Sequence, residues 1–391
     1  MRHVGTQAFG VRLPIVSQGD DLAGMVADAL FDVARANNLT LRETDVVGVT
    51  EALVAKSQGN FASIDAIAAD IRKKFPGGEV GVVFPILSRN RFLNILKGIS
   101  RGAEKVHVLL QYPCDEVGNP LMNPEDVDAL FDSGETLFTG AGFKKATGNY
   151  CHPFTGVDYI SLYQEAGGNI DVHVASDPRR ILDLTAHVLV AEIHTRQMTK
   201  NRLLKAGAAT VYTLSDVLAE PENGSGYNPQ FGVLGSNLSG EGVLKLFPRD
   251  SDDFVRAVRA RIARKCGVAP EVLVYGDGAF KDPLAGIWEL ADPVVSPAYT
   301  DGLKGRPREI KIKLVADGLA GTMGSAEKTA AITEMIREKN NNADKECVSA
   351  GTTPRNYVDL LGSLCDLISG SGDKGTPVVL IQGYFDDYSS L

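Results

Sequence analysis

The chain has 391 residues, of which 44% are hydrophobic and 23% are charged, and its formal net charge is −9. This is ordinary globular composition and enough chain for two or three domains, which excludes a disordered protein and a small disulfide-stapled scaffold. The acidic balance gives no overall field that would draw the protein to nucleic acid or to an anionic membrane, so we expect neither as a partner.

The cellular compartment is indicated by the cysteines and by the N-terminus. The five cysteines are odd in number and none lies in a Cys-x-x-Cys pair, which favours free thiols in a reducing compartment. The first residues contain no apolar signal segment, and no apolar run approaches the roughly 20 residues that cross a bilayer. We therefore expect a cytoplasmic location.

The first eighty residues alternate between helical and strand-like patterns. Apolar residues recur at helical spacing over residues 19–38, with Asp20 or Asp21 as a suitable N-cap. Residues 46–55 predict a short buried strand, or a strand that runs into a helix. Residues 64–74 predict a second helix, which a Pro-Gly-Gly sequence ends.

The next segments predict an α/β layer. Residues 79–86, 90–102 and 105–113 have the order strand, helix, strand, which indicates parallel pairing. Residues 114–149 are rich in Gly, Pro, Asn and Asp and predict long loops, with a short helix near residues 124–131.

Two longer patterns follow. We expect a hairpin at residues 159–176 and a long amphipathic helix, or helix pair, at residues 177–207. On that helix His187 and His194 would share a face two turns apart, a separation at which two ligands rarely hold one ion. We interpret them as ordinary histidines.

The last third of the chain begins after a polar, Gly- and Pro-rich stretch at residues 220–230, which suits a domain boundary. Strands and helices alternate here as well, so we expect a mixed α/β (α+β) fold with an inserted α/β lobe. The predicted helices are 250–267, 329–340 and 356–370. The predicted strands are 271–278, which ends in a turn, 308–318 and 376–384.

Two N-terminal segments carry candidate binding chemistry. Leu13, Pro14, Ile15 and Val16 form an extended segment before a helix start, where backbone groups could bind a base; the alternative is a simply capped helix. Lys56 lies beside small residues and a glycine, which suits a phosphate anchor or, alternatively, a solvated lysine.

Three further segments suit phosphate or its counterion. Asp277 follows an apolar strand in a Gly-rich turn, where a carboxylate could bind a hard cation on nucleotide phosphates, although an ordinary Asp-Gly turn has the same pattern. Arg89 and Arg91 flank a predicted helix start, which suits a substrate anion or a basic surface turn. A loop that allows close approach to phosphate, or that is simply flexible, contains Ser369, Gly370, Ser371, Gly372 and Lys374.

In this order the segments resemble the F420-0:γ-glutamyl ligase family, which joins L-glutamate to a phosphate-bearing deazaflavin precursor with GTP and divalent cations. The resemblance covers residues 10–75 and 226–385. In the N-terminal part it rests on residues 13–16, 19–22 and 51–59, where Lys56 has the position of the family's lysine. In the C-terminal part it rests on residues 232–237, 246–252, 277–278, 315–320 and 369–379.

The resemblance implies an amide ligase that works through an acyl phosphate, uses GTP or ATP with Mg²⁺ or Mn²⁺, and forms a homodimer. The ligase-like domain would consist of residues 1–80 and 223–391, with 81–222 as the inserted lobe. The implied metal ligand is Asp277. The implied nucleotide contacts are Leu13, Pro14, Ile15, Val16, Glu51, Lys56, Asn237, Ser369, Gly370, Ser371, Gly372 and Lys374.

The chain departs from the family pattern at three expected metal positions. Leu234 stands where the family has an aspartate, Gly278 where it has a threonine and Ser371 where it has a glutamine. We therefore expect at most one well-bound ion, unless Glu241, Asp282 or Asp301 substitutes. Two alternatives remain: a nucleotide-binding or regulatory protein that has lost metal-dependent catalysis, and a scaffold whose inserted lobe is the functional part.

Overall fold

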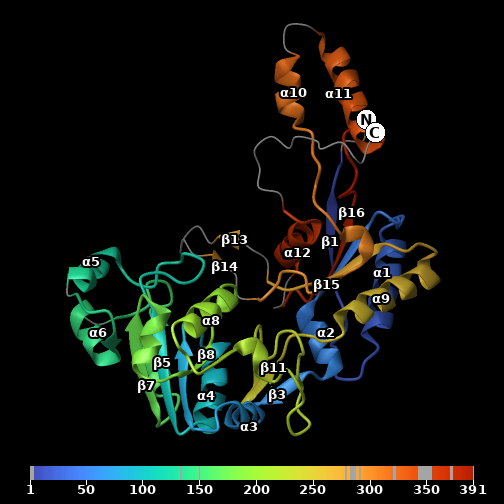
Figure 1. The fold of residues 1–391 in the computed structure, drawn as a ribbon. Coiled ribbons are helices and arrows are strands. Elements are labelled where there is room, and N and C mark those ends of the chain that lie inside the picture. Colours follow the sequence, from blue (N-terminus) through green and yellow to red (C-terminus); the bar gives the residue numbers. More distant parts are fainter. Residues whose placement is uncertain are drawn as a thin grey trace.

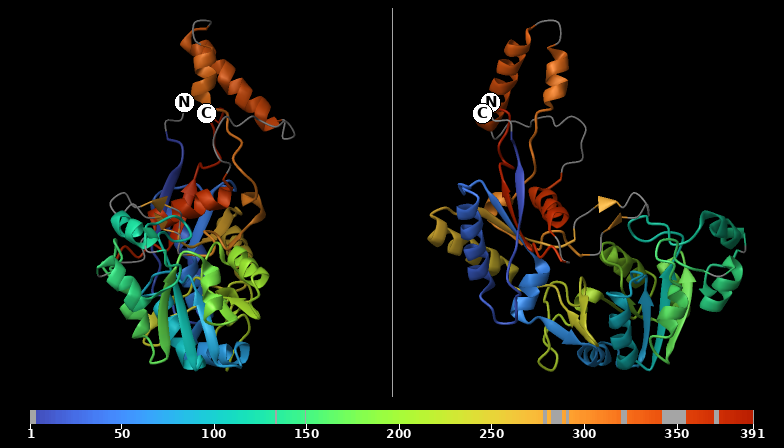
Figure 2. Two further views of the ribbon diagram at one scale, coloured as in Figure 1. Left: turned by 60° about the vertical axis from the view of Figure 1, so that its left-hand side comes forward. Right: turned by 180° about the vertical axis from the view of Figure 1, so that it is seen from behind.

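The computed structural model contains two lobes and a projecting helical arm (Figure 1). The arm consists of α10 (Ile312–Gly318) and α11 (Ser325–Asn341), and Figure 2 shows it extending away from both lobes. The described residues are 4–132, 134–148, 150–277, 280–281, 288–289, 292–319, 323–341, 355–369 and 373–390.

A five-stranded sheet forms the core of the first lobe. Its central strand β2 (Val46–Thr50) has three buried valines around a buried glycine, as expected of a strand covered on both faces. Helices α1 (Leu22–Ala36) and α9 (Ser251–Cys266) cover one face, and α12 (Tyr357–Ile368) covers the other. The strand order is β1 (Gln7–Val11), β16 (Val378–Gln382), β2 (Val46–Thr50), β12 (Glu271–Tyr275) and β15 (Ala298–Tyr299).

The register of this sheet brings four loops to one edge. β2 and β12 run parallel, and β16 is antiparallel to β2 and to β1. Val11, Val378, Val49 and Val274 therefore lie in one row across the sheet. The chain leaves β1, β2 and β12 and enters β16 at this same edge, which we call the site edge.

A six-stranded sheet forms the second lobe. All neighbours are parallel except β6 with β7. Counting the parallel strands along the chain, their spatial order is third, second, first, fourth, fifth, which is a doubly wound arrangement. The full order is β6 (Phe138–Thr139), β7 (Ile170–Ala175), β5 (Lys105–Gln111), β4 (Glu79–Val83), β8 (His187–Val190) and β9 (Thr210–Thr213).

Helices cover both faces of the second sheet. α3 (Ile64–Lys74) and α4 (Phe92–Gly102) pack on one face, and the 3-10 helix η1 (Pro178–Asp183) and α8 (Arg196–Lys205) lie on the other. The remaining elements are α2 (Glu51–Gln58), α5 (Pro124–Asp132), α6 (Gly140–Thr147), α7 (Tyr159–Gln164), η2 (Leu214–Asp216), η3 (Asp301–Leu303), a small sheet of β3 (Phe61–Ser63), β11 (Val243–Lys245) and β10 (Asn237–Gly240), and the pair β13 (Phe280–Lys281) and β14 (Trp288–Glu289).

Most of the strongly patterned elements are confirmed. The predicted mixed α/β class is confirmed, as is the parallel strand–helix–strand unit of β4, α4 and β5. The helix expected at 64–74 has those bounds, and the side chain of Asp21 caps α1 by accepting from the Gly24 N–H at 3.2 Å. Among the described residues no helix has both the length and the hydrophobicity of a membrane span.

Three predicted elements are wrong, each for a physical reason. Residues 159–176 form α7 followed by β7 rather than a hairpin, and residues 177–207 form η1, β8 and α8 rather than a long helix. Short parallel strands such as β8 are buried on both faces, so they lack the alternation that would separate them from a helix. His187 therefore lies in a strand and His194 in the turn after it, and they share no helix face.

The third error is at residues 308–318, where a strand was expected and α10 forms instead. No residue of α10 is buried. Alternation of Lys and apolar residues indicates a strand only when one face of the segment is buried. Because α10 packs no residue into a core, the alternation does not determine its structure.

Close packing across the first sheet depends on Gly48. A Cβ at Gly48 would lie 2.4 Å from the Cys365 Sγ of α12 and 3.2 Å from Tyr275 Cδ1. We predict that Gly48→Ala lowers the free energy of unfolding by about 1–3 kcal/mol through overpacking, as measured by urea denaturation.

Gly318→Ala is the matched control, since a Cβ there meets nothing within 4 Å. We expect this control to stay within about 0.5 kcal/mol of the original chain or to gain slightly. The variant Gly48→Ala/Cys365→Ala should lose less than the sum of its single changes, because the two side chains are in contact. Equal losses in Gly48→Ala and Gly318→Ala would contradict the packing account.

Candidate functional site

The predicted binding segments converge on the site edge. The Arg12 Nε–H donates to the Lys374 carbonyl oxygen at 3.2 Å, and the Thr50 N–H donates to the Pro377 carbonyl oxygen at 3.0 Å. The Gly19 N–H donates to the Ser57 carbonyl oxygen at 2.9 Å. The loop after β1, the loop before β16 and helix α2 are therefore neighbours, although they are far apart in sequence.

The side chains of these segments are largely open to solvent. Ile15 is 88% exposed, whereas Val16 beside it is buried in the core of the first lobe. Lys56 lies exposed in the last turn of α2, and Lys374 is also exposed. An exposed isoleucine and two exposed ammonium groups on these neighbouring segments can offer apolar contact to a base and positive charge to phosphates.

The loop between α12 and β16 is only partly within the described residues. Ser369 ends α12, and its hydroxyl donates to the Asp366 carbonyl oxygen at 3.1 Å. Gly370, Ser371 and Gly372 lie outside the described residues. Their predicted phosphate contacts stay predictions.

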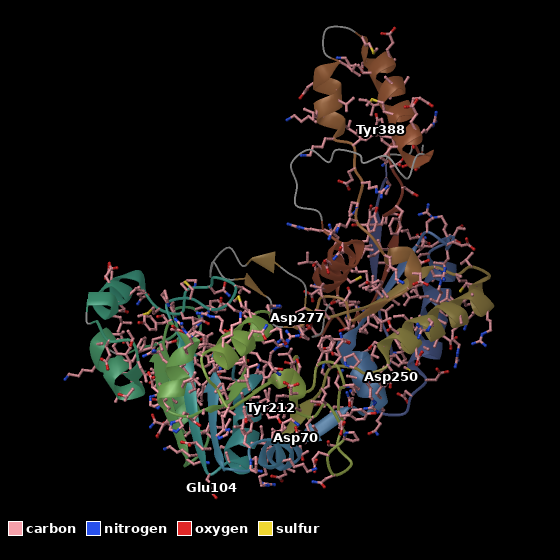
Figure 3. All side chains as sticks on the ribbon, in the orientation of Figure 1. Asp70, Glu104, Tyr212, Asp250, Asp277 and Tyr388 are labelled. Carbon is pink, nitrogen blue, oxygen red and sulfur yellow. The ribbon has the colours of Figure 1, made fainter. Side chains whose placement is uncertain are left out.

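An ion-pair cluster joins the two lobes beside Asp277. Arg91, at the start of α4, donates from Nη2 to Asp277 Oδ2 at 2.6 Å and from Nη1 to Asp292 Oδ1 at 2.7 Å. Asp277 follows β12 in the first lobe, and Figure 3 shows it between the two lobes. The guanidinium thus bridges carboxylates that belong to the opposite lobe.

Asp292 is the buried member of this cluster. Its side chain is 2% exposed, and its Oδ2 accepts the backbone N–H of Asp277 at 2.7 Å. A buried carboxylate is stable only when charged or N–H donors satisfy it, and Arg91 and Asp277 do so. Gly276 is required here, since a Cβ at that position would lie 2.4 Å from Asp292 Oδ2.

A second buried ion pair lies at the start of α2. Lys245 Nζ donates to Glu51 Oε1 at 2.7 Å, and the two side chains are 11% and 7% exposed. Burial raises the pKa of Glu51 to about 7; the Lys245 ammonium opposes this shift, and the negative charge of Asp292 adds to it. Glu51 Oε2 is buried and has no hydrogen-bond partner within the described part of the chain, so it can accept from a bound ligand.

Asn237 and Arg89 lie where the small sheet meets the second lobe. The Leu238 N–H donates to the Asn90 carbonyl oxygen at 3.0 Å, which holds β10 against the turn before α4. Asn237 is half-buried and Arg89 is exposed. Arg89 can meet an anion from solvent, whereas Arg91 already binds two carboxylates.

The carboxylates of this edge fit one hard cation better than two. Asp277 is 46% exposed and has the oxygen donors that Mg²⁺ and Mn²⁺ prefer. Leu234 is buried in the core and supplies no donor. Asp301 lies beyond the start of β12, at the opposite edge of the sheet, and pairs with Lys304.

The other two substitutes offer no second donor among the described residues. Glu241 is exposed in the turn between β10 and β11, where the Gly242 carbonyl oxygen accepts from the Ile64 N–H. Asp282 lies outside the described residues, as does Gly278.

Sequence reasoning missed Asp292 and Lys245. A signal existed for Lys245, because a lysine inside an apolar strand pattern requires a buried acidic partner. No comparable signal marked Asp292, since nothing in its spacing shows that it accepts a backbone N–H 15 residues earlier.

The family described as F420-0:Gamma-glutamyl ligase matches residues 10–383, which is nearly the whole chain. No curated protein matches the chain.

The buried Glu51 predicts a pH dependence of stability. Its pKa is raised from 4.5 to about 7, so the native state binds more protons than the unfolded state between these values. This contribution to stability is complete below pH 4.5 and is lost as pH rises through about 7. We predict that Glu51→Gln makes the slope of unfolding free energy against pH less negative in this window, by up to about 1.4 kcal/mol per pH unit.

Urea unfolding at several pH values measures the slope of unfolding free energy against pH for the original chain and for Glu51→Gln. The exposed Glu43→Gln is the control and should keep the original slope. Glu51→Gln/Lys245→Met replaces the single variant if the unpaired Lys245 prevents folding. Slopes identical to that of the original chain would show that Glu51 does not titrate in this range.

Proposed function

The chain belongs to the F420-0:gamma-glutamyl ligase family, and on this premise we propose that it is a nucleotide-dependent amide ligase. It would join L-glutamate, or a similar amino acid, to an acidic acceptor such as F420-0. The observation that carries the proposal is the convergence of residues 13–16, Glu51, Lys56, Asp277 and Lys374 on one sheet edge.

The proposed reaction has two steps. The acceptor carboxylate attacks the terminal phosphorus of GTP or ATP, which forms an acyl phosphate and releases the nucleoside diphosphate. The amine of glutamate then attacks the acyl carbon, loses a proton and releases inorganic phosphate, so that an amide bond forms. Positioning and charge stabilisation dominate such phosphoryl transfers.

The residues of the site edge divide this work. Backbone groups of residues 13–16 and the exposed side chain of Ile15 would hold the base, and Glu51 Oε2 would accept a donor from the nucleotide. Lys56 and Lys374 would neutralise phosphate oxygens. Asp277 would hold one Mg²⁺ or Mn²⁺, which offsets negative charge on the phosphates when it is bound.

The second lobe has a place where an acidic acceptor would bind. In doubly wound sheets ligands bind beyond the carboxyl ends of the strands where the strand order reverses, which in this sheet is between β4 and β8. The chain that leaves β4 there carries Arg89 and Arg91. Exposed Arg89 would attract an acidic acceptor toward Asp277.

A specific observation favours a second candidate, a nucleotide-binding or regulatory protein that has lost metal-dependent catalysis. Arg91 already supplies positive charge to Asp277 and Asp292, and Leu234 supplies no ligand. Calorimetry with GTP, ATP and GDP, with and without Mn²⁺, tests nucleotide binding. Phosphate release that requires both glutamate and acceptor separates the ligase from the binding protein, and no nucleotide affinity would overturn both.

Lys56 provides a test of the nucleotide site. We predict that Lys56→Ala weakens nucleotide binding by about 1.5–3 kcal/mol, the contribution of a charge-assisted hydrogen bond. Isothermal titration calorimetry measures the change. Lys205→Ala, an exposed lysine of the second lobe, should bind as the original chain does. Equal affinity in both variants would mean that Lys56 is a solvated lysine.

Metal binding at Asp277 can be tested by Mn²⁺ titration with GDP, followed by electron paramagnetic resonance. We predict at most one tight ion, its loss in Asp277→Asn, and tighter binding in Arg91→Gln because a competing cation is removed. Two tight ions in the original chain would refute the single site. A titration unchanged by Asp277→Asn would refute the ligand assignment.

A further inference from the structure

A second cluster of titratable side chains lies on the six-stranded sheet, away from the site edge. His107 on β5 and Asp171 and His173 on β7 each place a possible ligand atom within 4.8 Å of the others. His107 is directly paired with Asp171 in the parallel ladder, and His173 follows two residues later on the same face. All three side chains are half-buried.

The cluster lies on the face of the second sheet that η1 and α8 cover only in part. Leu109 and Ala175, further along the same strands, pack with η1 and α8 in an apolar cluster. The positions nearer the strand starts carry polar groups instead, with Lys105 paired to Glu79 in the ladder. This sheet face thus changes from apolar residues to histidine and carboxylate within two residues along each strand.

Two ring nitrogens in this cluster lack partners. Within the described part of the chain, His107 Nδ1 and His173 Nε2 are buried and make no hydrogen bond. Buried polar atoms are normally satisfied, because leaving one unpaired costs about 1–3 kcal/mol. Each of these two nitrogens therefore lacks the partner that a buried ring nitrogen normally has.

Glu79 fixes which nitrogen of His107 is available. Its Oε1 lies 3.1 Å from His107 Nε2, so the ring donates its Nε2–H to the carboxylate and Nδ1 keeps its lone pair. A carboxylate on the far nitrogen is the usual outer partner of a histidine that binds a metal ion. The cluster thus contains two imidazole nitrogens, one carboxylate ligand and one orienting carboxylate.

We propose that His107 Nδ1, His173 Nε2 and a carboxylate oxygen of Asp171 bind one divalent transition-metal ion of the zinc type. Two imidazoles and a carboxylate suit Zn²⁺, Co²⁺ or Ni²⁺, and a water molecule completes four-coordination. Ligand atoms in a tetrahedral zinc site are roughly 3.4 Å apart, so the side chains converge slightly on binding.

Metal binding by Asp171 requires Lys105 to give up its ion pair with that carboxylate. The Lys105 ammonium lies 2.5 Å from Asp171 Oδ2, but its side chain is 41% exposed and can turn into solvent. The bound ion would tie β5 to β7 at the end of the sheet away from Asp277. The site is separate from the proposed nucleotide site. It supplies imidazole nitrogens, which suit zinc-type ions and not Mg²⁺.

The test uses the full chain, stripped of metal and without a polyhistidine tag, and needs no nucleotide. We expect one equivalent of Co²⁺ to produce visible d–d absorption bands, and Zn²⁺ to displace it. His173→Ala should abolish this saturable binding, and Glu79→Gln should weaken it by about 10–100-fold. Zn²⁺ should also raise the melting temperature of the original chain but not that of His173→Ala.

His187→Gln is the matched control, since His187 lies on the same sheet but its Nδ1 is already paired with Thr210 Oγ1 at 3.3 Å. It should bind Co²⁺ as the original chain does, and so should Asp277→Asn. If His173→Ala misfolds by circular dichroism, Asp171→Asn takes its place and should also lose binding. Absence of Co²⁺ bands, or equal binding by His173→Ala and His187→Gln, would overturn the proposal.

Discussion

The guanidinium of Arg91 lies between Asp277 and Asp292, and the arrangement of the two lobes depends on this contact. Asp292 is almost fully buried, and its carboxylate oxygens are satisfied by the Arg91 guanidinium and by the Asp277 N–H. Removing one partner of such a buried pair typically costs about 3–5 kcal/mol, because the other charge is left uncompensated. The contact therefore fixes the start of α4 against the end of β12.

The same edge collects charges of both signs. Glu51, Asp277 and Asp292 stand against Arg91 and Lys245, and the five side chains belong to segments that are distant in sequence. The burial of Glu51 raises its pKa, and the negative charge of Asp292 raises it further. This set has three carboxylates and two cations, so a phosphate would have to meet positive charge elsewhere, and exposed Lys56 and Lys374 are the residues proposed for that role.

The strands that build this edge could be predicted from sequence because each carries a simple pattern. β2, β12 and β16 are short, mostly apolar and valine-rich runs bounded by Gly, Pro or polar turns, and such runs can be recognised from the local sequence alone. The order of the binding segments was also recognisable, since it repeats the order of the family motifs.

Other features required information that no local pattern holds. β8 has four residues and no alternation, so it could not be told from a helix without knowing that α8 and η1 cover it. The pairing of Arg91 with Asp292 spans 201 residues and depends on how two lobes meet. The His107 and His173 pair has the same origin, because only the strand order places β5 beside β7.

The position of Arg91 on one lobe and of both carboxylates on the other has a thermodynamic consequence. A cation bound at Asp277, as proposed above, would compete with Arg91 and would weaken the contact between the lobes. By linkage, a change that breaks the Arg91–Asp277 contact would raise the affinity of Asp277 for that cation by the same factor. Under this proposal, the contact between the lobes and the cation occupancy would report on a single equilibrium.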